Sequence, residues 1–163
     1  MIFVIVGTHP IGFPRLFEEL DMIAPRLNDK ITAQIGHNKI LPKNFEYFRF
    51  IEDDDEFRKH LKNADIVICH GGAGSILDAL FLGKRVVVVP RLSKLKEHSD
   101  DHQLELSKKL NAVGFVDMVL DIKKLRSTIL KVKKQGKRKI KEGNTLRKFI
   151  GGWLDDNEQT KRN

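Results

Sequence analysis

The sequence predicts a single α/β domain built on a Rossmann-like, doubly wound parallel sheet. Short apolar runs alternate along the chain with amphipathic stretches of helical spacing. Two of these runs, Ile2–Val6 and Val86–Val89, are continuously hydrophobic, which is typical of parallel strands buried on both faces. A third, Ile66–Cys69, ends in a glycine-rich turn that opens into a helical pattern. This alternation indicates helices on both faces of one sheet.

The other elements follow from the same patterns. Pro14 is expected in the first turn of a helix that continues to Leu27, because proline is favoured at the start of helices. The acidic run Glu52–Glu56 opens another helix, where negative charge suits the N-terminal dipole. Gly83 is expected to end the helix that follows the glycine-rich turn. Three further strands are expected at Thr32–Ile35, Tyr47–Ile51 and Phe115–Val119. A further helix is expected to start at His102, and a basic helix is expected on the apolar positions Leu125, Ile129 and Val132.

Length and composition fit one soluble globular domain. With 163 residues, of which 40% are hydrophobic and 32% charged, the chain is large enough for a core and too apolar to be disordered. No apolar run approaches the ~20 residues of a membrane helix, and the first residues form a strand rather than a signal peptide. The single cysteine, Cys69, is expected to be a buried thiol and fits a reducing cytoplasm. No Cys/His set has the spacing of a metal site.

Basic charge is concentrated in one late stretch. Residues 123–148 contain twelve Lys and Arg and one acid, whereas the rest of the chain has eighteen basic and twenty-one acidic residues. We expect residues 1–154 to form the domain, with basic helices over 121–154, a last apolar patch at Phe149, Ile150, Trp153 and Leu154, and a flexible tail over 155–163. The stretch is either a solvated helix face or a surface for anionic lipid or an acidic partner. Nucleic acid is disfavoured because aromatic residues are not interleaved and no reader motif is present.

A glycine-rich loop is the strongest functional signal. It is formed by His70, Gly71, Gly72, Ala73, Gly74 and Ser75. Glycines let the backbone approach a ligand, and the unpaired N–H groups of the following helix suit a phosphate or diphosphate. Asp78 follows Gly74 by about one helical turn, so its carboxylate is placed to accept hydrogen bonds from a ribose. A tight turn without any ligand remains the alternative at this point, because one glycine-rich loop is a weak signal.

Two more loops follow strand ends on the same edge of the sheet. The first contains Gly7, Thr8 and His9, where His9 either binds a phosphate or sugar hydroxyl or caps the turn. The second follows the strand Val86–Val89 and supplies the candidates Pro90, Arg91, Lys96, His98, Asp101, His102 and Gln103. In an open α/β sheet these strand ends lie around one crevice, so the three loops together predict a ligand site.

With these motifs in place, the chain resembles the C-terminal domains of glycosyltransferase family 28. The resemblance covers roughly residues 1–119, and it is closest to the small two-component enzymes, both the bacterial PssE-type polysaccharide glycosyltransferase subunits and the UDP-GlcNAc transferase of the dolichol pathway. It is carried by four motifs, Gly7-Thr8-His9-Pro10, Gln34-Ile35-Gly36, His70-Gly71-Gly72-Ala73-Gly74-Ser75 and Asp101-His102-Gln103. The resemblance implies the donor-binding half of a GT-B glycosyltransferase.

The resemblance also implies roles for single residues. Asp78 would hold the ribose, although the usual residue there is a Glu, and Gln103 would contact the sugar hydroxyls. Gly72, Gly74 and Ser75 would lie at the diphosphate, whose growing charge in the reaction is stabilised by helix N–H groups without a metal. His9, His70 and Lys96 are expected to add donors or positive charge, and His9 is one candidate for the general base. The base is otherwise supplied by a partner.

The function expected from the resemblance is transfer of a sugar, with UDP-GlcNAc favoured, to a lipid-linked acceptor. A membrane-anchored acceptor-binding subunit would complete the enzyme, and this chain would lie at the cytoplasmic face of the membrane through that partner. No cofactor is implied besides the UDP-sugar itself. The alternative is a nucleotide-binding regulatory module without transfer activity. The identity of the sugar does not follow from the sequence, because pocket shape decides it.

Overall fold

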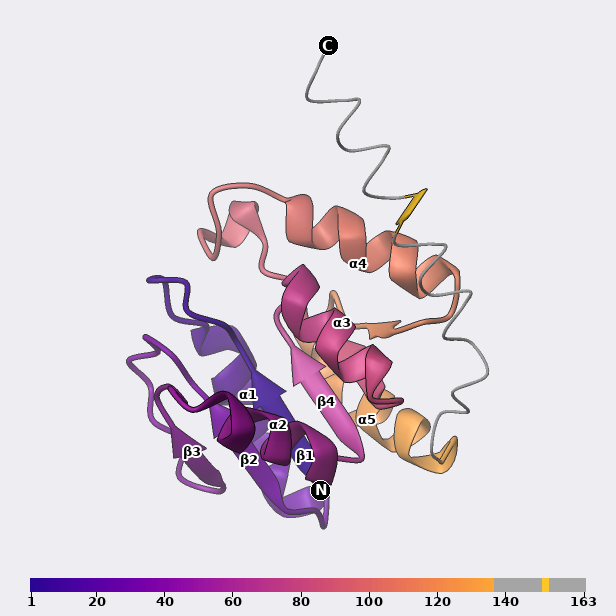
Figure 1. Cartoon of the computed structure of the whole chain (residues 1–163). Helices are drawn as coiled ribbons and strands as arrows, with labels where there is room; N and C mark the ends of the chain where they lie inside the picture. Colours follow the sequence, from indigo (N-terminus) through magenta and orange to yellow (C-terminus); the bar gives the residue numbers. More distant parts are fainter. Residues whose placement is uncertain (137–150, 153–163) are drawn as a thin grey trace.

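The computed structural model describes residues 1–136 and 151–152, and these form a six-stranded, all-parallel sheet (Figure 1). The spatial order is β3-β2-β1-β4-β5-β6. Successive strands are therefore added toward one edge of the sheet from β1 to β3 and toward the other edge from β4 to β6, and this switch lies between β1 and β4. Ile2 of β1 lies opposite Ile31 of β2 and Ile66 of β4. The predicted fold class is confirmed. The strands are β1 (Ile2–Ile5), β2 (Ile31–Gln34), β3 (Glu46–Phe48), β4 (Ile66–Cys69), β5 (Arg85–Val88) and β6 (Asp117–Met118).

Helices cover both faces of this sheet. They are α1 (Pro14–Ile23), α2 (Asp54–Asn63), α3 (Ala73–Phe81), α4 (His102–Ala112) and α5 (Leu125–Lys134). Three short 3-10 helices lie between them, η1 (Ala24–Arg26), η2 (Ser93–Leu95) and η3 (Ile122–Lys124). Pro14 occupies the first turn of α1, as predicted. The helix expected to reach Leu27 ends at Ile23 and continues as η1, which contains Pro25.

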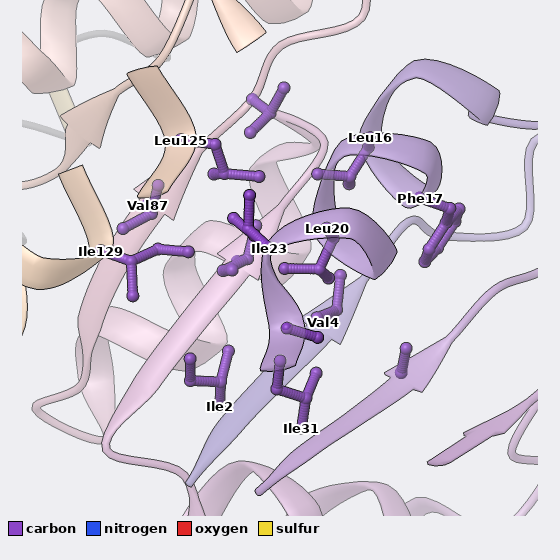
Figure 2. Close-up of a cluster of buried hydrophobic side chains, with 14 of the residues drawn as sticks. Ile2, Val4, Leu16, Phe17, Leu20, Ile23, Ile31, Val87, Leu125 and Ile129 are labelled. Carbon is purple, nitrogen blue, oxygen red and sulfur yellow. The ribbon is translucent and has the colours of Figure 1, made fainter. Parts of the chain in front are cut away.

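The core consists of two hydrophobic clusters separated by the sheet. Alternate side chains of a strand point to opposite faces, so Ile2 and Val4 join one cluster while Phe3 and Ile5 join the other. Figure 2 shows the first cluster, in which the apolar faces of α1 and α5 meet the sheet. The second cluster is formed with residues of α2, α3 and α4. Burial of each strand on both faces explains its continuously hydrophobic sequence.

The two edge strands are shorter than the sequence predicts. The strand expected at Tyr47–Ile51 is β3, Glu46–Phe48, and the residues after Phe48 turn toward the neighbouring loop, where the ring of Phe50 contacts His37. The strand expected at Phe115–Val119 is reduced to the two residues of β6, because the N–H of Phe115 instead bonds the carbonyl of Leu110 at the end of α4. Strand propensity alone does not predict that the end of a helix and a strand compete for the same residue.

Local capping follows the sequence closely. Asp53 is the N-cap of α2, and its carboxylate accepts the N–H groups of Asp55 and Glu56 at 2.7 and 2.9 Å. Gly83, with φ +68°, ends α3 as expected, in an arrangement in which Gly83 and Lys84 donate to the carbonyls of Leu80 and Ala79.

Part of the basic stretch belongs to η3 and to α5, and three of its lysines are ion-paired within the chain. Lys123, Lys131 and Lys133 contact the carboxylates of Glu19, Asp117 and Asp29, respectively. The apolar patch predicted at Phe149, Ile150, Trp153 and Leu154, and the tail over 155–163, lie outside the described residues. Within the described part of the chain, every helix is too short or too polar to cross a bilayer.

Asp53 offers a test of this local structure. We expect Asp53→Ala to lower the free energy of unfolding by about 1 kcal/mol, the usual effect of losing an N-cap side chain. Urea denaturation measures the change. Asp55→Ala, which removes a first-turn carboxylate that makes no cap bond, is the matched control and should cost less. Equal losses in the two variants would contradict the capping role.

Candidate functional site

The site lies where the strand order reverses between β1 and β4. In open parallel sheets, loops at the carboxyl ends of the strands form a crevice at this position. The loops that follow β1, β4 and β5 meet here, and Arg91 is hydrogen-bonded to both of the other loops. The carbonyl of His70, after β4, accepts the N–H of Arg91, after β5, at 3.2 Å. The predicted convergence of the three loops is therefore confirmed.

His70 lies at the centre of this convergence, packed between two glycines. A Cβ atom on Gly7 would lie 3.0 Å from the His70 ring, and one on Gly72 would lie 2.5 Å from its Nε2. Real Cβ contacts are essentially never shorter than 3.0 Å, so Gly72 has no space for a side chain. Gly7 also has φ +68°, a conformation that glycine adopts without strain. Both glycines are therefore explained by packing of the backbone against an imidazole.

The His70 imidazole is neutral. Its Nδ1 lies 3.3 Å from the carbonyl of Ile5, which only accepts, so Nδ1 carries the proton. Burial is the main cause that lowers its pKa to about 4, and Arg91, His98 and His9 act in the same direction. Of the donor or positive charge expected from His70, the neutral ring supplies no positive charge. The adjacent Cys69 is also inert, because burial raises the pKa of its thiol to about 12.

The N-terminus of α3 is open toward the crevice. Its N-cap is Gly72, and no side chain among the described residues caps the free N–H groups of the first turn. Gly74 is exposed, and a Cβ built there meets nothing within 4 Å. Ser75 follows it and is half-buried. On the other side of the loop, Gly71, with φ +98°, is packed against Gln103 and Ser107 of α4. This helix end is therefore a ready site for an anion.

Arg91 has a structural position that the sequence did not predict. It was expected to touch the substrate, but it is only 1% exposed. Its guanidinium stacks on the ring of Phe13 at 4.7 Å and donates to the carbonyl oxygens of Gly12 at 2.9 Å and Glu97 at 3.2 Å. These contacts join the loop after β1 to the loop after β5. Arg91 therefore shapes the crevice from below.

A second arginine completes this connection. Arg15, at the start of α1, makes a two-pronged ion pair with the buried carboxylate of Glu97, with both N–O distances at 2.8 Å. It also donates to the carbonyl of Pro90 at 3.0 Å, which accounts for the place of that buried proline. Glu97 in turn accepts the N–H of Leu92 at 3.0 Å. The Glu97 carboxylate thus holds the loop after β5 in place through its bonds to Arg15 and Leu92.

The remaining candidate ligand-binding residues lie in the outer part of the loop after β5 and at the start of α4. Lys96 is exposed and left-handed, with φ +57°, which is uncommon for a residue with a side chain. The ring of His98 packs on that of His9 with centroids 4.6 Å apart. Asp101 accepts the N–H of Ser93 at 3.0 Å and so closes the loop. The side chain of His102 is 83% exposed and lies 3.9 Å from Glu105.

Gln103 combines partial burial with an unmet hydrogen bond. Its Oε1 is buried and has no hydrogen-bond partner within residues 1–136 and 151–152. Such an atom is costly unless something else bonds it, so it marks a place where a ligand hydroxyl or a water would be accommodated. Gln103 lies against Gly71, beside the open end of α3. Thr8, at the end of β1, is exposed and forms the opposite border of the crevice.

Asp78 lies further along α3, on its exposed side. It lines a surface groove of about 390 Å³ between α2 and α3. Apolar side chains of both helices, such as Phe57 and Phe81, and charged ones, such as Arg58, line the same groove. Asp78 is therefore separate from the His9–His98 pair and adjoins a groove wide enough for part of a nucleotide.

Asn38 is a residue of the site that sequence reasoning missed. It is fully buried, accepts the N–H of Phe13 at 3.0 Å, and donates to the carbonyl of Ile40. It thereby fixes the loop after β1 to the loop after β2. The only signal in the sequence was an Asn directly after Gly36-His37 at the expected end of a strand. Among the described residues, no group of three or more His, Cys, Asp and Glu side chains is arranged to hold a metal ion.

These features define a Rossmann-like domain with a crevice at the switch point of its sheet. The comparison with protein families places it more closely. Residues 1–150 match the glycosyltransferase family 28 C-terminal domain, and the chain belongs to this family. Its fold is that of the C-terminal half of a GT-B glycosyltransferase.

Individual relatives agree with this assignment. The chain is 31% identical over 124 residues to the human "UDP-N-acetylglucosamine transferase subunit ALG13", an alignment that covers 69% of this chain and 10% of the human protein. It is 27% identical over 103 residues to the UDP-N-acetylglucosamine–N-acetylmuramyl-(pentapeptide) pyrophosphoryl-undecaprenol N-acetylglucosamine transferase of Rubrobacter xylanophilus, covering 61% of this chain and 30% of that protein. A solution structure of ALG13 shares the fold, with a TM-score of 0.57 and 19% identity over 86% of this chain and 88% of that one.

The glycines of the loop give a test that separates packing from ligand access. Gly72→Ala should lower the free energy of unfolding by about 1–3 kcal/mol, the usual cost of overpacking a core. Gly74→Ala should raise it by about 0.5–1 kcal/mol, because alanine is the better helix former and the space is open. Urea denaturation of both variants measures this. Stability changes of the same sign in the two variants would contradict the packing of His70 described here.

Proposed function

We propose that this chain is the donor-binding, catalytic subunit of a glycosyltransferase that transfers GlcNAc from UDP-GlcNAc to a lipid-linked acceptor. The observation that carries the proposal is the open N-terminus of α3 at the switch point of a family 28 domain. The two curated relatives are both named as UDP-N-acetylglucosamine transferases, which supports this donor. The alignments cover only part of each relative, so donor and acceptor are both part of the proposal.

In this proposal the donor extends along α3. The diphosphate lies at the first turn of the helix, against Gly72, Gly74 and Ser75, whose backbone N–H groups stabilise the charge that UDP gains as the glycosidic bond breaks. Asp78 holds the ribose hydroxyls, and the nucleoside occupies the groove between α2 and α3. Gln103 contacts the sugar hydroxyls through its unpaired Oε1. These groups require no metal ion.

The acceptor is supplied by a second protein. The matching family model is that of a C-terminal domain, and human ALG13 is named a transferase subunit. We therefore propose a membrane-anchored subunit that binds the lipid-linked acceptor and holds this chain at the cytoplasmic face of the membrane. The general base comes either from that subunit or from His9. The basic residues beyond α5 add an attraction to anionic lipid.

Donor binding gives a residue-level prediction. Asp78→Ala should weaken binding of UDP and UDP-GlcNAc alike, by about 1–3 kcal/mol, the range for a lost hydrogen bond to a charged group. Gln103→Ala should weaken UDP-GlcNAc more than UDP, because its partner is the sugar. Titration calorimetry measures both, with Glu105→Ala on the exposed side of α4 as the control. If Gln103→Ala affects both ligands equally, its assignment to the sugar is wrong.

Transfer itself depends on the partner. The purified chain should bind UDP-GlcNAc but transfer little sugar, whereas adding the separately encoded acceptor subunit should restore transfer, because orientation of two substrates lowers the barrier by several kcal/mol. Transfer of radiolabelled GlcNAc to a lipid acceptor is the assay, with UDP-glucose and UDP-galactose as competing donors. Full transfer by the chain alone would refute the dependence on a partner. Binding without transfer, even with the partner, would favour the alternative of a regulatory nucleotide-binding module.

A further inference from the structure

Three loops at the carboxyl edge of the sheet expose large aliphatic side chains. Ile11, on the loop after β1, is 42% exposed, and Ile40, on the loop after β2, is 38% exposed. Leu95, in η2 on the loop after β5, is 49% exposed. One exposed aliphatic residue needs no explanation, but three of them on adjacent loops define a surface.

The loops of Ile11 and Ile40 are in direct contact. A Cβ atom on Gly12, next to Ile11, would lie 3.0 Å from the Cα of Asn38. The Asn38 side chain accepts the N–H of Phe13 at 3.0 Å and donates to the carbonyl of Ile40. Because this amide side chain is fully buried, its hydrogen bonds fix the two loops to each other.

The loop of Leu95 is joined to the same turn after β1. Arg91 donates to the carbonyl of Gly12 at 2.9 Å and to the carbonyl of Glu97, two residues after Leu95, at 3.2 Å. Because the sheet is all parallel, the loops after β1, β2 and β5 all leave it at its carboxyl edge. Figure 1 shows the loops after β1 and β5 projecting from the same end of the sheet. The three exposed aliphatic residues therefore lie along one end of the molecule.

Lysines flank two of the aliphatic residues. Lys39 precedes Ile40, Lys94 precedes Leu95, and both lysines are exposed. Within residues 1–136 and 151–152 neither lysine forms an ion pair, whereas the three lysines of η3 and α5 described above are paired with carboxylates. We call Ile11, Lys39, Ile40, Lys94 and Leu95 the basic–apolar rim.

The acidic residues of the same three loops are engaged within the chain. Glu97 is buried in its ion pair with Arg15. Asp100 and Asp101 each accept a backbone N–H group at 3.0 Å. The charge that the rim offers to its surroundings is therefore positive, and it complements an anionic surface.

The composition of the rim suits a lipid surface better than a protein surface. Protein interfaces favour aromatic residues and Arg and disfavour Lys, whereas the rim consists of aliphatic residues and Lys. A long lysine side chain places its charge among lipid headgroups while a neighbouring aliphatic side chain enters the boundary of the acyl chains.

We propose that the basic–apolar rim docks this chain directly on an anionic lipid bilayer. The three aliphatic side chains enter the headgroup boundary, and the two lysines lie among the anionic headgroups. This contact goes beyond the proposed function, in which a partner subunit holds the chain at the membrane. Because the rim and the crevice share the carboxyl edge of the sheet, docking brings the crevice to the lipid surface.

A single-site probe tests insertion, because Cys69 is the one cysteine of the chain and is fully buried. The full chain with Leu95→Cys or Ile40→Cys is labelled with an NBD group and mixed with phosphatidylcholine vesicles, with or without about 30% phosphatidylserine. On the anionic vesicles alone, we expect NBD emission to rise about twofold or more and to be quenched by brominated acyl chains. Val113→Cys, also half exposed but at the other end of α4, is the matched control and should not respond.

Flotation with the same anionic vesicles tests the charges. Lys39→Gln/Lys94→Gln should lower the partition coefficient by about tenfold or more, at about fivefold per lysine, and this loss should shrink at high salt. Lys109→Gln/Lys134→Gln, at the last turns of α4 and α5, removes the same charge from the opposite edge of the sheet and should lower it clearly less. Residues 137–148 contain six further Lys and Arg that attract these vesicles, so the difference between the two double variants is the decisive quantity. Melting temperatures verify that each variant is folded.

Three results would overturn the proposal. They are an NBD group at the rim that does not respond, equal losses in the two double variants, and rim variants that weaken a complex with the acceptor subunit while binding vesicles normally. The last result would assign the rim to an acidic protein surface instead. If Leu95→Cys does not fold, Ile40→Cys decides the insertion. No nucleotide is present in these experiments, so a negative result leaves the donor binding of the proposed function to its own titration.

Discussion

The packing of the His70 ring between two glycine backbones is the contact on which the geometry of the site depends. The ring separates Gly7, after β1, from Gly72, at the start of α3, and its Nδ1 bonds the carbonyl of Ile5. Because Gly72 has no space for even a methyl group, the first turn of α3 is held at a fixed distance from the end of β1. A neutral imidazole suits this place, because a charged one would be costly to bury.

Next to the crevice, the charged side chains of Arg91, Glu97 and Arg15 join the loop after β1 and the start of α1 to the loop after β5. Arg91 is enclosed by Phe13 and by backbone carbonyls, and the buried carboxylate of Glu97 is held by the half-buried Arg15. Breaking such a pair is strongly destabilising, but replacing a whole pair by apolar residues is often neutral, so stability alone does not explain its presence. In the proposed function, the excess positive charge gives a second reason, because it attracts the diphosphate.

Much of the fold could be predicted because its signals are local. The run Ile66–Cys69, the N-cap Asp53 and the end of α3 at Gly83 follow from hydrophobicity and capping, which depend on neighbours in sequence. The convergence of three loops followed from the topology of parallel sheets. The structural role of Arg91 could not be predicted, because its partners, Phe13 and Gly12, are far away in the sequence. The same holds for Asn38, whose bond to Phe13 exists only once two loops are placed side by side.

The N-terminus of α3 and the loop after β5 border the crevice in different ways. The N-terminus of α3 offers dipoles whose strength does not change with pH, and its position is set by the core. The loop after β5 is anchored at Glu97 but carries its outer residues, Lys96 and His98, on a turn with an unusual backbone conformation at Lys96. In the proposed reaction the diphosphate gains charge when the sugar leaves. Fixed dipoles stabilise that extra charge without reorganising, because the packed core already holds them in place.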